Sequence, residues 1–227
     1  MRSRASWLFN AILLCTVSSA AQNALAASTT LEYKGFAYSS SGGTIYADLN
    51  PAKYGLESKS VVAGGFNMIE KSTGTSLIAW CVDVFHALNN KFEYTIGNSS
   101  QLNRADDLQK LVNQRYAEVT DKKTSTAFQL AIWEIVTDTG GGYSLANGTF
   151  QASGFGNAQA LAGNWLKLDG KTSGNYKINY FYDGIMNDKT IAQNLISISS
   201  VPLPGAAILM LSALGLGGLL HRRRRIA

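Results

Sequence analysis

The chain has 227 residues, which is room for one ordinary globular domain together with targeting segments. With 46% apolar and 15% charged residues it can bury a core, so a fibre or a disordered tail is excluded. The net charge of +5 comes from the ends, because Arg2, Arg4 and residues 222–225 are basic whereas every acidic residue lies within 32–188. The nearly neutral middle lacks the clustered Lys and Arg that nucleic-acid binding needs.

The first 26 residues have the pattern of a secretory signal peptide. Arg2 and Arg4 make the start positive, residues 7–21 are mostly apolar, and Ala24-Leu25-Ala26 offers small residues for cleavage. We expect signal peptidase to cut after Ala26 and the body, residues 27–200, to be exported. An N-terminal membrane anchor is disfavoured because the apolar run is shorter than the ~20 residues that cross a bilayer.

The first part of the body predicts extended structure. Alternating residues favour strands over 28–38 and 44–49, with Gly42-Gly43 between them in a hairpin-like arrangement. Gly64-Gly65 interrupts a third extended stretch, 60–69, and residues 71–74 predict a turn. Residues 77–88 are rich in Val, Ile, Phe and Trp and predict a central strand that carries Cys81, followed by a strand over 92–96.

The hydrophobic period then changes to three and four residues. This pattern predicts helices over 102–119, 124–136 and 158–168, the second capped by Thr124 or Ser125 and ended by Gly140-Gly141-Gly142. Strands over 176–182 and 191–198 complete the body. This order predicts a single α+β domain, in which an antiparallel sheet or sandwich is accompanied by a small helical layer.

The last 27 residues, 201–227, combine three features. Pro202-Leu203-Pro204 is followed by an uncharged apolar stretch, 205–220, and then by Arg222, Arg223, Arg224 and Arg225. Sixteen helical residues span about 24 Å of a ~30 Å hydrocarbon core, so 205–220 predicts a marginal membrane helix. The arginines should remain cytoplasmic, which leaves the body outside the inner membrane. A buried core helix is disfavoured because four arginines are hard to house.

This tail resembles the PEP-CTERM sorting signal of Gram-negative, exopolysaccharide-producing bacteria, in its Val-Pro-Leu-Pro variant. Leu203 stands where that family usually has Glu. The resemblance implies transient anchoring in the inner membrane and recognition by the sorting peptidase of that system, an exosortase. Cleavage near Pro204 would then transfer the body to the cell surface or release it into the extracellular matrix of a biofilm.

Cys81 is the one cysteine of the body, because Cys15 leaves with the signal peptide. An internal disulfide is therefore impossible even though an exported protein meets oxidising conditions. His86 is the one histidine of the body, so a zinc site of the usual Cys/His type is not expected. No phosphate loop or other cofactor motif is visible, and we predict neither a metal nor a cofactor.

Two short segments stand out together: Ala79-Trp80-Cys81-Val82-Asp83 and the helical Ala127-Phe128-Gln129-Leu130-Ala131-Ile132-Trp133-Glu134. They resemble the two halves of the Cys-Gln thioester domains of bacterial surface adhesins, which often have Thr where this chain has Phe128. The resemblance implies a thioester between Cys81 and Gln129 that serves covalent adhesion or stabilisation. It also implies an environment for this bond made by Trp80, Asp83, Phe128, Trp133 and Glu134, and an amine- or hydroxyl-bearing partner.

The chemistry sets its own requirements. A thiolate that attacks the Gln129 carboxamide displaces ammonia, and primary amides resist this unless the groups are held in contact and the oxyanion meets donors. Trp80, Phe85, Phe128 and Trp133 are candidates for excluding water. A bond across 48 positions would also restrict the unfolded chain by about 4 kcal/mol, if the loop-entropy model for disulfides applies.

Two other classes of function remain open. In the first, Cys81 is an inert core thiol, and the body is a non-covalent glycan- or protein-binding surface module that uses Tyr33, Tyr38, Tyr176, Tyr180 and Tyr182. In the second, Cys81 and His86 form a cysteine hydrolase. Five positions apart on one strand, these two side chains point to opposite faces, so we do not expect an enzyme.

Overall fold

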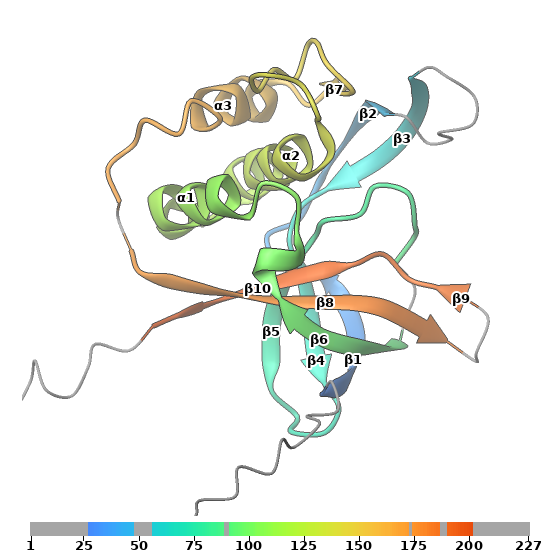
Figure 1. Ribbon diagram of the computed structural model, residues 1–227. Helices are drawn as coiled ribbons and strands as arrows, with labels where there is room; N and C mark the ends of the chain where they lie inside the picture. Colours follow the sequence, from blue (N-terminus) through green and yellow to red (C-terminus); the bar gives the residue numbers. More distant parts are fainter. Residues whose placement is uncertain (1–26, 48–55, 89–90, 173, 187–189, 202–227) are drawn as a thin grey trace, which may run out of the picture.

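The computed structural model describes residues 27–47, 56–88, 91–172, 174–186 and 190–201 (Figure 1). The predicted signal peptide, 1–26, and the sorting motif with its apolar stretch and arginines, 202–227, lie outside the described residues. Within the described ranges, no helix has the length and apolar character needed to span a bilayer.

Six antiparallel strands close into a barrel-like sheet, so the predicted α+β class with antiparallel sheets is confirmed. The strand order is β10-β5-β4-β1-β6-β8, and β10 also pairs with β8, which closes the ring instead of leaving one layer of a sandwich. The strands are β1 (Ser28–Phe36), β4 (Phe66–Glu70), β5 (Ser76–Cys81), β6 (Lys91–Asn98), β8 (Tyr176–Met186) and β10 (Leu195–Ser200), with β9 (Thr190–Ile191) paired to β8.

Two of the predicted extended stretches belong to a second, three-stranded sheet. Its order is β3 (Glu57–Ala63), β2 (Ser41–Ala47) and β7 (Phe150–Ser153). The predicted hairpin between the first two strands is therefore wrong, because β1 pairs with β4 and β6 whereas β2 pairs with β3 and β7. Gly64-Gly65 separates β3 from β4, as the sequence indicates, and at this point the chain passes from one sheet to the other.

Three helices gather on one side of the barrel beside the smaller sheet (Figure 1). They are α1 (Ala105–Arg115), α2 (Lys122–Thr137) and α3 (Asn157–Trp165), and the short 3₁₀ turns η2 (Ser99–Gln101) and η3 (Tyr116–Glu118) flank α1. The central helix α2 contacts α1, α3 and strands of both sheets. Its residues from 125 to 135 are all buried, which explains why its sequence is apolar on more than one face.

The start of α2 differs from the prediction. Asp121 is the N-cap: its side chain accepts a hydrogen bond from the Thr124 backbone, and the Thr124 hydroxyl accepts one from Asp121 in return. Ser125 is instead buried, where its hydroxyl accepts a hydrogen bond from the Gly65 backbone N–H at 3.0 Å. This contact ties α2 to the point where the chain leaves β3 for β4.

The tyrosines proposed to line a glycan surface do not gather in one place. Tyr33 stands beside Phe36 and Phe66, Tyr176 packs edge-on against Tyr116, and Tyr180 stacks on Tyr182. These tyrosines are thus spread over several packing contacts.

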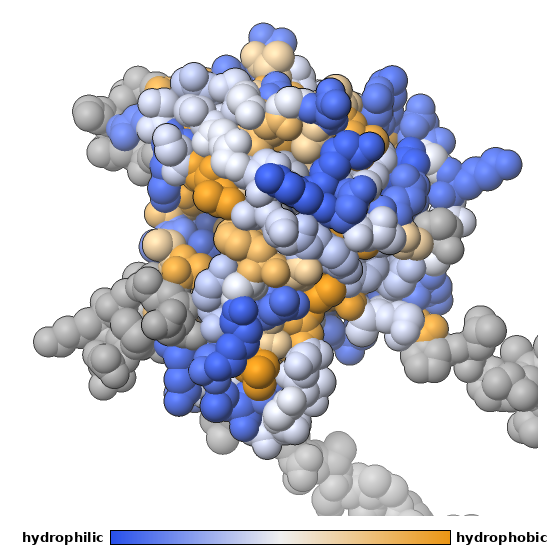
Figure 2. Space-filling view, turned by 180° about the vertical axis from the view of Figure 1, so that it is seen from behind, coloured by the Kyte–Doolittle hydropathy of each residue, from blue (hydrophilic) through white to orange (hydrophobic). Residues whose placement is uncertain are grey.

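On the rear face of the molecule, apolar side chains form a band between hydrophilic regions (Figure 2).

Glycine at position 43 is required by packing. A Cβ atom at Gly43 would lie 2.5 Å from the ring of Phe155, which is buried, whereas a Cβ at the neighbouring Gly42 would meet nothing closer than 3.9 Å. We expect Gly43→Ala to lower the free energy of unfolding by about 1–3 kcal/mol, because the ring must be displaced from a packed site. Gly42→Ala is the matched control and should change it by about 0.5 kcal/mol or less. Urea unfolding measures both, and equal midpoints for the two variants would contradict this role of Gly43.

Candidate functional site

Cys81 and Gln129 lie in direct contact through the backbone of the cysteine and the side-chain amide of the glutamine. Cys81 is the last residue of β5, and Gln129 projects from the middle of α2 with no exposed surface. The Gln129 Oε1 atom accepts a hydrogen bond from the Cys81 backbone N–H at 3.0 Å, and Nε2 donates to the Cys81 carbonyl at 2.7 Å. One carboxamide is thus hydrogen-bonded to both the N–H and the C=O of Cys81.

The sheet geometry explains why this position needs a side-chain amide. Strand β4 begins at Phe66, opposite Ala79, so Cys81 extends beyond the end of its neighbour. On the other side of β5, Cys81 faces Leu195 of β10. Buried backbone groups must find partners, and Gln129 occupies the place where β4 would have continued. A glutamine within an otherwise apolar helical segment was the sequence signal for this contact.

The sulfur atom of Cys81 is held by the next turn of chain. It donates a hydrogen bond to the Asp83 carbonyl at 3.0 Å and accepts one from the Asp83 backbone N–H at 3.3 Å. Burial raises the pKa of the Cys81 thiol to about 12, although the nearby Trp133 side chain and the Asp83 backbone lower it in part. At neutral pH the group is therefore a protonated thiol, and its nucleophilic form is rare.

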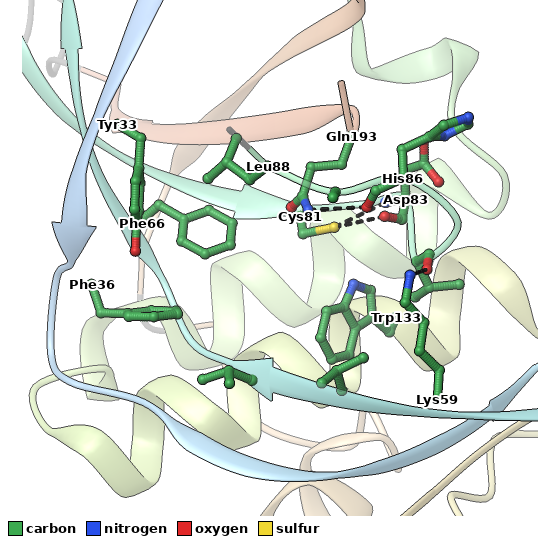
Figure 3. A pocket seen from close by; sticks show the side chains of 14 residues that line it. Tyr33, Phe36, Lys59, Phe66, Cys81, Asp83, His86, Leu88, Trp133 and Gln193 are labelled. Carbon is green, nitrogen blue, oxygen red and sulfur yellow. Dashed lines mark hydrogen bonds and ion pairs between the residues drawn. The ribbon is translucent and has the colours of Figure 1, made fainter. Parts of the chain in front are cut away.

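A pocket of about 260 Å³ opens beside this sulfur (Figure 3). Cys81, Asp83 and Trp133 line it, as do Lys59 of β3 and the aromatic side chains of Tyr33, Phe36 and Phe66. The Trp133 indole nitrogen and the Gln193 Oε1 atom are buried and have no hydrogen-bond partner among the described residues. The pocket therefore combines apolar walls with a buried acceptor on Gln193 that has no partner among the described residues and with an indole N–H that lies near the Cys81 sulfur.

The chain leaves the sheet after Cys81, which corrects the prediction of a strand over 77–88. Asp83 lies in the following turn, where its carboxylate accepts hydrogen bonds from the Phe85 N–H at 2.9 Å and pairs with His86 Nδ1 at 2.6 Å. Phe85 is 46% exposed, so it does not shield the sulfur from water. The apolar residues that follow Cys81 resemble a strand in composition but contribute side chains to a pocket rim.

His86 lines the same pocket as Cys81, so the expectation that they face opposite sides of a strand is wrong. The imidazole nevertheless lies on the outer side of Asp83 and points away from the sulfur (Figure 3). Its side chain is 43% exposed. The contacts of the Cys81 sulfur are with the Asp83 backbone, not with a base, which does not match the nucleophile–base pair of a cysteine hydrolase.

Trp80 lies on the face of β5 opposite to the pocket, where it packs against Phe128 of α2. Both side chains belong to the core. Their rings meet edge to face with centroids 4.9 Å apart, and Phe128 also packs against Tyr116 and Trp165. Because side chains alternate along a strand, Trp80 points toward the helices while Cys81 points toward the pocket. Of the four aromatic residues considered for excluding water, Trp133 alone lines the pocket.

Glu134 is placed away from the thiol, at the loop that follows α2. It is fully buried, and its Oε1 atom accepts a hydrogen bond from the Ser144 backbone N–H at 2.6 Å. Burial raises the pKa of Glu134 to about 7, and the neighbouring Asp138 carboxylate adds to the shift. Glu134 therefore anchors the loop, and it is neither solvated nor part of the thioester environment.

Lys59 and Gln193 line the pocket, although nothing in the sequence indicated this for either residue. Lys59 comes from the second sheet and Gln193 from the turn before β10, and no local pattern connects either of them to Cys81. Their placement follows from barrel closure and from the contact of β3 with α2.

Comparison of the chain with known family models, characterised proteins and solved structures finds no match.

The contact between Gln129 and Cys81 has a measurable structural role apart from any reaction. In a Cys81→Ala background, which cannot form a thioester, we expect Gln129→Leu to lower the free energy of unfolding by about 3 kcal/mol. The reason is that the N–H and C=O of residue 81 lose their partners in a buried site. Gln151→Leu is the control, because its amide makes one exposed hydrogen bond to Gly148. Equal urea midpoints for the two variants would refute this role.

The raised pKa of Glu134 predicts a pH dependence of stability. The unfolded side chain ionises near its ordinary value of 4.5, but the folded one ionises only near 7, so the folded protein binds the extra proton between these values. Stability from this group is therefore present below the unfolded pKa and is lost as the pH rises through 7. Between pH 5 and pH 8, the wild type should lose about 2 kcal/mol more than Glu134→Gln. Parallel pH profiles of the two proteins in chemical denaturation would contradict this.

Proposed function

We propose that the body is an exported cell-surface or matrix protein that forms an internal thioester between Cys81 and Gln129. The observation that carries this proposal is the buried carboxamide of Gln129, hydrogen-bonded through both polar atoms to the backbone of the one cysteine in the body. The resemblance of the two segments to bacterial thioester domains supports it. The bond serves covalent attachment to an amine- or hydroxyl-bearing partner, or stabilisation of the body.

The contacts supply several of the requirements of thioester formation. The Cys81 N–H already points at Gln129 Oε1 from 3.0 Å, within the range of an oxyanion donor, so it would stabilise the charge that develops there. The sulfur belongs to the same residue, and attack on the carboxamide carbon would require it to leave its contacts with the Asp83 backbone. Burial raises the pKa of the Cys81 thiol to about 12, and this opposes attack by the sulfur. The same burial keeps water from the finished bond.

The ends of the chain supply the rest of the proposal. Signal peptidase releases residues 1–26, the apolar stretch holds the protein transiently in the inner membrane, and an exosortase-type peptidase cuts near Pro204. This route would deliver the body to the cell surface or the matrix. Neither an enzymatic activity nor a nucleic-acid partner belongs to this function.

A non-covalent binding module is the second candidate. Two observations favour it: the thiol is buried and protonated at neutral pH, and the pocket offers an acceptor on Gln193 that has no partner among the described residues. In this case Cys81 is a core thiol and the Gln129 amide acts as a structural bridge. The two candidates differ in the covalent state of the protein.

Intact-mass measurement of the protein purified after export separates them. A thioester gives a mass lower than the sequence mass by one ammonia, and both Cys81→Ala and Cys81→Ser abolish this deficit. Circular dichroism verifies that the variants remain folded. A full sequence mass, with Cys81 alkylated completely after unfolding, would refute the thioester and favour the binding module.

A further inference from the structure

We propose that Lys59 is a built-in acyl acceptor of this site, and that it converts the thioester into an amide bond between the Lys59 and Gln129 side chains. The inference rests on the proposed thioester and specifies its use: the bond is an intermediate in a self-made cross-link. Lys59 lies on β3, opposite Ile45 of β2, and its side chain enters the pocket that contains Cys81 (Figure 3).

Lys59 is the one primary amine among the residues that line this pocket. Its Nζ atom donates a hydrogen bond to the Val84 carbonyl at 3.3 Å, one residue beyond the Asp83 backbone that holds the sulfur. The positive charge of Lys59 is close enough to the thiol to favour its ionised form. The amine thus lies within electrostatic reach of the sulfur and is held by a long hydrogen bond to a neutral carbonyl, which costs little to release.

The hydrogen bonds of Gln129 give a reason why the thioester would not be the end of the reaction. Loss of ammonia removes the Nε2 donor that serves the buried Cys81 carbonyl, and a thioester carries no N–H to replace it. An amide formed with Lys59 has an N–H again, and a local rotation can direct it to this carbonyl. The Cys81 N–H keeps its acceptor while the thioester stands, since Oε1 remains on the acyl group.

The reaction balances without an added reagent. The Cys81 sulfur attacks the Gln129 carboxamide carbon, the C–N bond breaks, and ammonia leaves with the thiol proton. The Lys59 ammonium gives a proton to solvent. The neutral amine attacks the thioester carbonyl carbon, the C–S bond breaks, and the sulfur regains a proton from the attacking nitrogen. The net change joins a carboxamide and an amine into a secondary amide and ammonia.

Placement in one pocket favours Lys59 over a partner from outside. An amine on the same folded chain reacts without the loss of translational freedom that an external amine undergoes. The product would covalently join β3 of the three-stranded sheet to α2, the helix that contacts both sheets. The Thr126 hydroxyl of α2 already donates a hydrogen bond to the Ala63 carbonyl of β3 at 3.2 Å, so the link would reinforce an existing contact between these two elements.

Four measurements on the exported protein test this proposal. We expect a mass deficit of one ammonia, complete alkylation of Cys81 after unfolding, no adduct with methylamine, and a proteolytic fragment in which the Lys59 and Gln129 peptides are linked. Lys59→Arg keeps the charge but removes the reactive amine. This variant should retain the mass deficit but now have a blocked thiol that methylamine opens to an adduct. Lys34→Arg, at an exposed lysine paired with Glu32, should behave as the wild type.

The outcomes separate the cross-link from the thioester. A wild-type protein with the mass deficit, a blocked thiol and a methylamine adduct would leave the proposed thioester standing and overturn the role of Lys59. A full sequence mass in the wild type would overturn both. The mass deficit with a free thiol in Lys59→Arg would also overturn the role of Lys59, because another residue would then have accepted the acyl group.

Discussion

The site depends on one contact, the carboxamide of Gln129 placed against the backbone of Cys81. The end of β5 projects beyond β4, and its buried N–H and C=O need partners that no strand provides. By supplying them, Gln129 fixes the position of α2 on the barrel. This position brings Trp133, one turn further along α2, to the pocket, while Trp80 and Phe128 form the core between helix and sheet.

The pocket exists because the chain changes direction immediately after this contact. Residues 82–88 turn out of the sheet, so the Asp83 backbone closes on the sulfur and His86 reaches the rim. The opposite wall comes from β3, which belongs to the other sheet and carries Lys59 inward. The chemically distinctive groups are thus contributed by a strand end, a helix and a separate sheet, which meet at one end of the barrel.

The sequence predicted the parts of this arrangement that depend on local pattern. The apolar residues of α2 indicated a helix, whereas the pairing of Cys81 with Gln129 was implied by the resemblance of their two segments to thioester domains. Barrel closure could not be predicted in this way, because the pairing of β10 with β5 joins segments that are far apart in the sequence and carry no marker of their partners. The end of β5 at Cys81 was missed because Val82, Val84 and Phe85 have the composition of a strand. Lys59 was missed because its role depends on tertiary placement alone.

The same burial has opposite effects on the two halves of the proposed chemistry. It keeps the Cys81 thiol protonated, with a pKa of about 12, and so slows the first attack. It also makes every unpaired polar group costly, and loss of ammonia would take away the donor that Gln129 supplies to the Cys81 carbonyl. A site with these properties favours a slow reaction that ends in an amide, because the amide again has an N–H. It disfavours a reaction that stops at the thioester and leaves an electrophile exposed. Internal cross-linking fits this energetic asymmetry better than prolonged waiting for an external partner.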